Sequence, residues 1–234
     1  MQTTLKVKLL AHTPDADKLV AAAAKLCYAK SDVDTLMDNL TPEKTEEFIE
    51  RLAELGHQSP IEHASYTFAV EGVSRALLAQ LTRHRIASYS VQSQRYVDKS
   101  DFDYVIPPSI AARKETRIAF EWLMEAVNKY YAYLSSYGDI PNEDARFVLP
   151  NACDTRIIFT MNARSLHNFF RLRCCNRAQW EIRAMADEML RLCREVSPAL
   201  FKHAGPSCAV SGVCGEGAMC CGEPRNKEDD NGEN

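Results

Sequence analysis

Hydrophobic and polar residues alternate between Ala64 and Val73, which is the period-two pattern of a half-buried β-strand. The apolar positions include Tyr66, Phe68 and Val70, which share one face of such a strand. Other short stretches are also predicted to be extended. We predict strands over residues 5–11, 64–73 and 156–161, and an extended segment over 104–106.

The longer segments between these strands carry apolar residues at helical spacing. Thr41 and Pro42 suit the start of one helix, as cap and first-turn residue, and Gly56 ends it. The longest segment, residues 109–137, is amphipathic throughout. We predict helices over residues 15–27, 42–55, 74–80, 109–137, 163–173 and 178–203.

Strands and helices in this order do not alternate as regular βαβ units, which favours an α+β fold. We expect a central, mostly antiparallel sheet flanked by long helices. A chain of 234 residues with 46% hydrophobic residues is long enough to bury one sizeable core, so a single compact domain is predicted. The glycines form neither a Rossmann nor a P-loop fingerprint, so clustered arginines would have to hold the phosphates of any dinucleotide.

Charge and hydropathy limit the possible partners. The net charge of −4 gives no long-range attraction to nucleic acid, so any anion site must be local. No apolar run approaches the roughly 20 residues that span a bilayer, and the N-terminus lacks a signal-peptide core. We expect a cytoplasmic protein without membrane contacts, in which the nine cysteines are thiols, or ligands where they cluster, rather than disulfides.

The segment from Arg83 to Tyr96 has the densest polar chemistry in the chain, with three arginines, a histidine, hydroxyls and amides. Cations are common in the last turn of a helix, so the dipole alone offers an explanation for Arg83 and Arg85. If the helix continued, these two side chains would lie about 200° apart and face different ligands. Ser93 and Arg95 would share one side of an extended segment and add donors that the dipole does not require. An anionic, hydrogen-bonding ligand is therefore indicated.

A second cluster of polar residues lies further along the chain. Arg173 and Arg177 would share a helix face if the helix ran on through Cys174 and Cys175, and a phosphate would then offset their repulsion. The alternative is a solvated face paired with Glu181 or Asp187. The cluster comprises Asn162, Arg164, Asn168, Arg171, Arg173 and Arg177.

His57, Glu62 and His63 form a third group, in which the spacing of the two histidines superficially resembles that of a metal site. Pro60 interrupts regular helix geometry between the histidines, and no third ligand is evident. We predict no metal here. A core or capping role is the commoner explanation for such residues.

The Arg-His-Arg sequence at 83–85, followed after seven residues by Ser93, resembles the signature of the flavin-dependent thymidylate synthases. The resemblance extends in order through further blocks, which are Gly56 to His63, Arg146 to Pro150, Asn162 to Leu166 and Ala178 to Glu181. It implies reductive methylation of dUMP to dTMP, with methylenetetrahydrofolate as carbon donor and FAD and NADPH as the hydride source, and with release of tetrahydrofolate. It also implies that arginines polarise the uracil and that no cysteine attacks it.

The resemblance assigns residues to the substrate. Arg173 would contact the base and Arg146 the phosphate, and Arg173, Arg83 and His57 would be the catalytic residues. Ser93 would position the substrate, since no adjacent base in sequence could activate it. The implied dUMP site is Gln80, Arg83, Ser93, Gln94, Arg95, Arg146 and Arg173.

The resemblance also assigns residues to the flavin, with His57 near its reactive face. The implied FAD site is Ser59, Glu62, Arg83, His84, Arg85, Ile86, Asn162, Arg164, Asn168 and Leu172. Arg177 stands where some members have a flavin-contacting histidine, so we do not assign it. Active sites of the family form between subunits of a homotetramer, which is the assembly expected here.

The C-terminal end differs in composition from the rest. We predict a thymidylate synthase domain over residues 1–206 and a Cys- and Gly-rich, polar tail over 207–234 that is partly disordered from Glu223 onward. Four tail cysteines have a spacing that matches no standard zinc pattern, which favours inert thiols over zinc binding or oxidative pairing. They are Cys208, Cys214, Cys220 and Cys221.

Two other classes of protein remain open. A nucleic-acid-binding module would use the arginine-rich helices but would normally carry a basic stripe, whereas this chain is acidic overall. A Cys-dependent pyrimidine methyltransferase would use Cys174, Cys175 or Cys193 as nucleophile. Substitution of the cysteines distinguishes this class from the flavin-dependent one.

Overall fold

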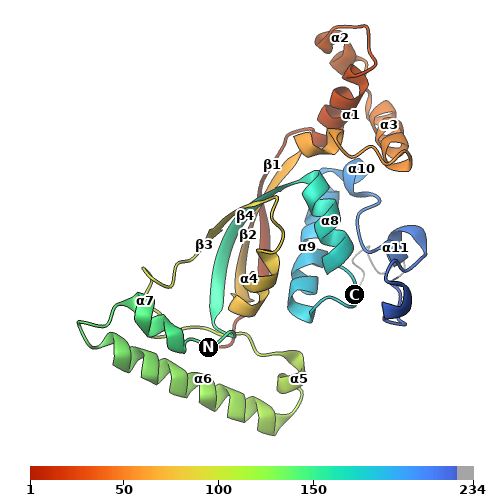
Figure 1. Cartoon of the computed structure of the whole chain (residues 1–234). Helices are drawn as coiled ribbons and strands as arrows, with labels where there is room; N and C mark the ends of the chain where they lie inside the picture. The colour runs from red at the N-terminus through yellow and green to blue at the C-terminus, as the bar shows by residue number, and fades with distance from the viewer. Residues whose placement is uncertain (226–234) are drawn as a thin grey trace. The chain divides into compact units, whose positions relative to one another are not determined.

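The computed structural model describes residues 1–225 of the chain and shows an α+β fold (Figure 1). Four strands form one sheet in the order β1 (Lys6–His12), β2 (Ser65–Ser74), β4 (Asp154–Asn162), β3 (Ser88–Val91). Backbone bonds from Ala163 N to Ala64 O and from Arg75 N to Cys153 O show that β2 and β4 are antiparallel. The predicted fold class and three of the strands are confirmed, whereas β3 was not predicted from the sequence.

Contacts divide the chain into two compact units, and neither is one continuous stretch. Unit 1 consists of Met1–Lys6, Ala69–Arg83 and Tyr89–Ile158. Unit 2 consists of Val7–Phe68, His84–Ser88 and the chain from Phe159 onward. Because the chain passes repeatedly from one unit to the other, the division does not correspond to domains that follow each other in sequence.

Unit 1 contains the predicted long helix, but in two pieces. Residues 109–137 form α5 (Pro108–Ala111) and α6 (Lys114–Ser135), because Arg113 adopts an extended conformation between them. The Thr116 hydroxyl donates to the carbonyl oxygens of Ile110 and Arg113 across this break. Met124 of α6 packs in a core with Phe102 and Cys153. The other helices of the unit are α4 (Arg75–Leu81), α7 (Asn142–Ala145) and η2 (Arg146–Val148).

Unit 2 is mainly helical, and α8 and α9 pack together within it (Figure 1). The predicted helix over 178–203 is interrupted, because Ser197 leaves the helical conformation and Pro198 starts a new helix. Buried Tyr66 donates its hydroxyl hydrogen to Ser197 Oγ at 2.7 Å. The helices are α1 (Ala16–Leu26), α2 (Val33–Asp38), α3 (Pro42–Glu54), η1 (Pro60–His63), α8 (Ala163–Arg173), α9 (Trp180–Val196), α10 (Pro198–Phe201), α11 (Ser207–Ser211) and η3 (Gly217–Met219). None of the helices within residues 1–225 is long and apolar enough to cross a membrane.

The tail is attached to the connection between α8 and α9. Arg177 Nη1 lies 2.7 Å from Glu216 Oε2, and Asn176 Nδ2 donates to the Glu223 carbonyl at 2.8 Å. Arg225 donates to the Cys174 carbonyl and pairs with Asp187. Residues 223–225 are therefore held in place, and the rest of the predicted disordered segment, 226–234, lies outside the described residues.

Candidate active site

The Arg-His-Arg segment follows α4 directly but is not helical. Ser74 caps α4 by accepting from Leu77 N, and the helix ends at Leu81, before Arg83 and Arg85. The helical-wheel argument for these two arginines was therefore wrong, because both lie beyond the helix. Contacts place Arg83 in unit 1 and its neighbour His84 in unit 2.

Ser93 and Arg95 lie in a turn, so the predicted extended segment at these residues is corrected. The Ser93 Oγ accepts from Arg95 N at 3.2 Å, and the Ser93 carbonyl accepts from Val97 N at 3.0 Å. This geometry holds the Ser93 hydroxyl next to the backbone of Arg95. Gln94, predicted to contact substrate, is buried and donates from Nε2 to Cys153 Sγ at 3.7 Å.

Arg95 and Arg146 meet at one acidic residue of α7. Arg95 Nε donates to the Glu143 carboxylate at 2.9 Å, and Arg146 Nε donates to the Glu143 carbonyl at 3.1 Å. Two arginines that were predicted, from separate parts of the sequence, to bind one nucleotide thus contact the same residue, one at its carboxylate and the other at its backbone carbonyl. Both partners of the Arg95 ion pair are about half exposed, so exchange of the carboxylate for another anion costs little.

Arg75, at the first position of α4, is a cation that the sequence analysis did not assign. Burial lowers the pKa of its guanidinium, and the nearby Arg146 cation lowers it further. Two partly buried cations near each other favour an anion between them. In the sequence, Arg75 was distinguished only by its position directly after the helix cap Ser74.

Gln80 lies in the last turn of α4, and its Nε2 donates to the Ala76 carbonyl of the same helix.

Arg173 is the last residue of α8, and it contacts His84 within unit 2. Its Nε donates to His84 Nε2 at 3.1 Å, and the imidazole packs edge-on against Phe169. Burial, followed by the Arg173 charge, lowers the pKa of His84 to about 4. The imidazole is therefore neutral at physiological pH and serves as an acceptor that orients the guanidinium.

The predicted sharing of a helix face by Arg173 and Arg177 is wrong, because α8 ends at Arg173. Arg177 lies in the following connection and pairs with Glu216 of the tail. Asp187, one of the two acidic residues considered as partners of this arginine cluster, pairs instead with Arg225 of the tail.

Several predicted flavin residues gather around the start of α8. Asn162 caps the helix, with Oδ1 accepting from Ser165 N at 2.8 Å. Arg164, in the first turn, forms an ion pair with Glu62 of η1, and both side chains are largely exposed. Ser59 precedes η1 and accepts from Glu62 N through its carbonyl. The blocks at 59–62 and 162–164, distant in sequence, are thus neighbours.

A cavity of about 540 Å³ in unit 2 is lined by Arg164 and Asn168 together with Arg171, His167 and Gln58. The two guanidiniums, those of Arg164 and Arg171, suit the phosphates of a dinucleotide, so the donor set fits part of an FAD molecule. Arg171 belonged to the arginine cluster in the sequence but was not assigned to the cofactor. Leu172 and Ile86 expose apolar side chains that could pack against an aromatic ring. Arg85, which precedes Ile86, is also exposed.

His57 is exposed and lines an adjoining cavity of about 240 Å³ with Leu52, Ile61 and His167, the last of which also lines the larger cavity. The cavity is mainly apolar, with imidazoles at its wall. Among residues 1–225, His, Cys, Asp and Glu form no group of three or more that suits a metal ion. Neither the tail thiols nor His57 and His63 belong to such a group among these residues.

The cysteines differ sharply in accessibility. Burial raises the pKa of Cys153 to about 11, and it raises that of Cys193 further. In the tail, a hydrogen bond shared with Cys220 raises the pKa of Cys214. The backbone of Gly222, and after it this shared bond, lowers the pKa of Cys220. All nine cysteines are thiols.

Comparison with solved structures identifies the class of enzyme that shares this fold. The crystal structure of the UMP/dUMP methylase PolB from Streptomyces cacaoi, bound with 5-Br dUMP, matches with a TM-score of 0.77. It is 25% identical in sequence, and the match covers 86% of this chain and 94% of the other.

Sequence comparisons identify the family. The family model described as thymidylate synthase complementing protein matches residues 8–199. A flavin-dependent thymidylate synthase from Clostridium tetani is 53% identical over 94% of both chains. One from Geobacter sulfurreducens is 54% identical, again over 94% of both chains. The chain therefore belongs to the flavin-dependent thymidylate synthase family of enzymes.

Proposed function

We propose that this protein converts dUMP to dTMP, with methylenetetrahydrofolate as carbon donor and with NADPH as the source of reducing equivalents through FAD. Tetrahydrofolate is the other product. The observation that carries the proposal is the convergence of Arg95 and Arg146 on Glu143, in a chain 53% identical to a flavin-dependent thymidylate synthase. It supports a site for a mononucleotide phosphate.

On the nucleotide side, the phosphate replaces the Glu143 carboxylate at Arg95 and is also bound by Arg146. Ser93, held against the Arg95 backbone, contributes a hydroxyl donor. Gln80, in the last turn of α4, and Arg83, just after that helix, would add further donors. The proposed dUMP site comprises Gln80, Arg83, Ser93, Gln94, Arg95, Arg146 and Arg173. Arg75 is a further cation for the same anion.

Arg173 polarises the uracil in this proposal. Its Nε is engaged by neutral His84, and a guanidinium carries four further N–H donors on its two Nη nitrogens. Donors held in place by a neighbour need no reorganisation when negative charge develops on a carbonyl oxygen. Arg173 and Arg83 thus stabilise charge on the base, which becomes nucleophilic without a cysteine adduct.

The proposed FAD site comprises Ser59, Glu62, Arg83, His84, Arg85, Ile86, Asn162, Arg164, Asn168 and Leu172. Arg164, with Arg171 on the same cavity, would hold phosphate oxygens, and Leu172 and Ile86 would contact apolar ring surface. His57 would lie near the reactive face of the ring. When bound, the reduced flavin supplies the hydride that completes the methyl group.

The buried cysteines support a mechanism without a thiol nucleophile. A thiol whose pKa is raised by burial, as for Cys193, is almost entirely protonated at neutral pH and reacts poorly. The Cys-dependent alternative through this residue is therefore disfavoured. For the nucleic-acid alternative, the arginines are distributed among local acidic partners such as Glu62, Glu143 and Glu216 rather than along a basic stripe.

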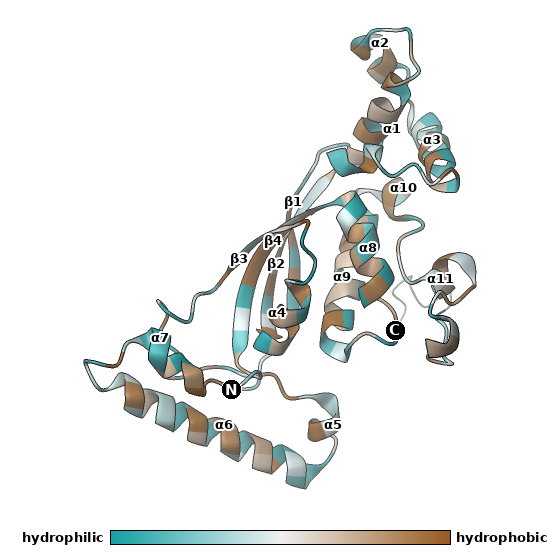
Figure 2. Ribbon diagram, in the orientation of Figure 1, coloured by the Kyte–Doolittle hydropathy of each residue, from teal (hydrophilic) through white to brown (hydrophobic). Residues whose placement is uncertain are grey.

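We further propose a homotetramer, supported by helix α6. Ile118, Trp122, Tyr130 and Tyr133 are all exposed and lie within an arc of about 120° on the helix. The opposite side of α6 buries Met124 and Tyr131, so the helix has two apolar faces. Figure 2 shows hydrophobic and hydrophilic residues interspersed along α6. Such an exposed stripe is typical of a surface covered by another subunit.

We propose residues 1–206 as the catalytic domain and 207–234 as a tail fastened to the connection after Arg173. A cytoplasmic location stays a prediction from the sequence. Product analysis tests the central proposal: the purified protein is incubated with dUMP, methylenetetrahydrofolate, FAD and NADPH. We expect dTMP and tetrahydrofolate in equal amounts, whereas formation of dihydrofolate, or no dTMP, would contradict it.

A further inference from the structure

One short stretch of unit 1, residues 151–156, holds the first turn of α4. Arg75 N donates to the Cys153 carbonyl at 3.1 Å, and Ala76 N donates to the Asn151 carbonyl at 3.2 Å. This stretch therefore fixes the start of the helix that carries Gln80 and leads to Arg83.

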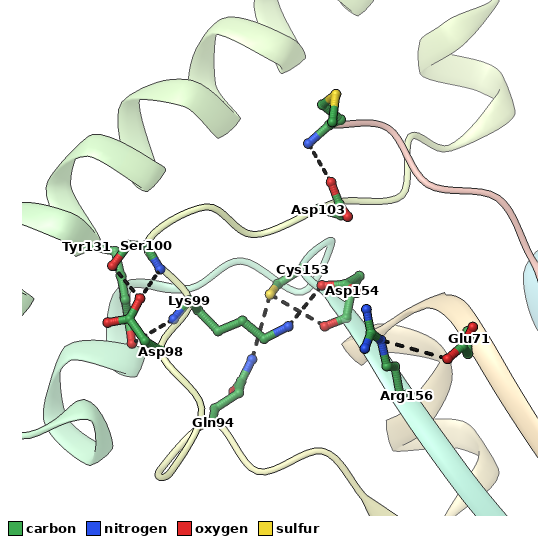
Figure 3. A network of polar contacts seen from close by, with 11 residues as sticks. Glu71, Gln94, Asp98, Lys99, Ser100, Asp103, Tyr131, Cys153, Asp154 and Arg156 are labelled. Atoms are coloured by element: carbon green, nitrogen blue, oxygen red, sulfur yellow. Dashed lines mark hydrogen bonds and ion pairs between the residues drawn. The ribbon is translucent and has the colours of Figure 1, made fainter.

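The same stretch also holds the segment 92–99 at three points. Gln92 N donates to the Arg156 carbonyl at 2.9 Å, and Gln94 Nε2 donates to Cys153 Sγ at 3.7 Å. At the far end, Lys99 Nζ lies 3.0 Å from Asp154 Oδ1. Figure 3 shows Lys99 reaching across to Asp154 beside Cys153 and Gln94. Ser93 and Arg95 lie between these attachment points.

The Lys99 and Asp154 side chains are only 9% and 10% exposed, unlike the other ion pairs of unit 1 among the described residues. The Lys99 backbone N–H also donates to the hydroxyl of Tyr131 at 3.3 Å, which ties the residue to α6. Burial of two charges costs several kcal/mol per ion before their attraction is counted. Apolar pairs of similar size are often as stable, so stability alone does not explain a charged pair here.

We propose that Lys99 and Asp154 are a positioning pair that fixes the register of segment 92–99 against β4, so that Ser93 and Arg95 are pre-organised for a nucleotide phosphate. The inference rests on the proposed dUMP site. Buried polar and ionic groups can specify one register where apolar contacts of similar size would allow several. Misplacement on that scale costs up to about 100-fold in reactions that need correct orientation.

The test compares variants by their KM for dUMP, their kcat and their melting temperature. Lys99→Met/Asp154→Leu replaces the pair with apolar residues of similar volume. We expect this variant to fold with bound flavin and a melting temperature near that of the wild type, but with a KM for dUMP raised about 10-fold.

The matched control is the exposed pair of Arg117 and Glu121 on α6, in the same unit and outside the proposed subunit-contact stripe. Arg117→Met/Glu121→Leu should leave the KM for dUMP unchanged. Equal KM values for the wild type and the folded Lys99→Met/Asp154→Leu variant would overturn the positioning role.

If the double variant does not fold, Asp154→Asn tests whether the charge pair positions segment 92–99. Asparagine keeps the size of the aspartate side chain and one oxygen acceptor for Lys99, but it removes the negative charge. A raised KM with unchanged kcat supports the inference, and a wild-type KM overturns it. Wild-type protein that neither binds nor methylates dUMP would refute the proposed function instead, so the two failures are distinguishable.

Discussion

Arg173 Nε donates to His84 Nε2 across 3.1 Å, which joins the middle residue of the signature to the end of α8. The imidazole can accept this hydrogen bond only in its neutral form. Burial and the Arg173 charge both favour that form and lower the His84 pKa to about 4. Arg173 is thereby oriented by a neighbour that adds no charge of its own.

This contact predicts a pH dependence of stability. The pKa of His84 is about 6.5 in the unfolded chain and about 4 in the folded one. The neutral imidazole therefore contributes fully to the free energy of unfolding above pH 6.5, and this contribution is lost as the pH falls toward 4. We expect the loss to be about 1 to 2 kcal/mol, after allowance for partial exposure.

Denaturant unfolding at pH 7 and pH 5 measures the effect, with His84→Gln as comparison, since glutamine accepts the same bond but does not titrate. The buried His167 titrates in both proteins and cancels in the difference. An identical pH dependence in the two proteins would contradict the assignment.

Arg173→Lys should lower kcat by about 10² to 10³-fold, with little change in bound flavin. Lysine keeps the charge but loses the fixed donors that stabilise developing negative charge. Steady-state kinetics at saturating dUMP measure the change. Arg191→Lys, on the exposed face of α9, is the control and should behave as the wild type. A kcat near that of the wild type in Arg173→Lys would rule out the proposed role.

Glu143→Gln should lower the KM for dUMP by about two- to fivefold. The Glu143 carboxylate competes with phosphate for Arg95, and an exposed ion pair contributes about 0 to 1 kcal/mol. The control, Glu121→Gln, removes a similar exposed Arg117 pair of the same unit and should leave KM unchanged. A higher KM in Glu143→Gln would mean that the phosphate does not replace this carboxylate.

Substitution of the candidate thiol nucleophiles should leave catalysis intact. We expect Cys174→Ala, Cys175→Ala and Cys193→Ala each to keep kcat within about threefold. The buried residues among them should lower the melting temperature, because core truncation costs about 1 to 2 kcal/mol. Turnover of dUMP by each variant measures kcat, and thermal unfolding measures the melting temperature. A folded, flavin-loaded variant that has lost turnover would favour the Cys-dependent mechanism.

The sequence predicted the elements whose signals are local. Alternation predicted β2, and the Thr41 cap with Pro42 predicted α3. The break at Ser197 had a readable signal in Pro198, but the one at Arg113 had none, since an extended arginine there depends on contacts made elsewhere. Helix periodicity alone does not mark such interruptions.

The site was predicted by type of residue rather than by geometry. Arginines and amides in one segment indicated an anion, but the partners of those side chains lie far away in sequence. His84 and Arg173 are 89 positions apart, and Lys99 and Asp154 are 55 apart. Pairings of this kind depend on how the strands assemble, and no local pattern encodes them.

The central claim is that a flavin in this protein is reduced by NADPH and responds to dUMP. An anaerobic absorbance spectrum of the FAD-loaded protein, recorded with NADPH and then with dUMP, tests it most directly. The account predicts flavin bands that NADPH bleaches and that dUMP perturbs. A protein that stays colourless and takes up no FAD would contradict it.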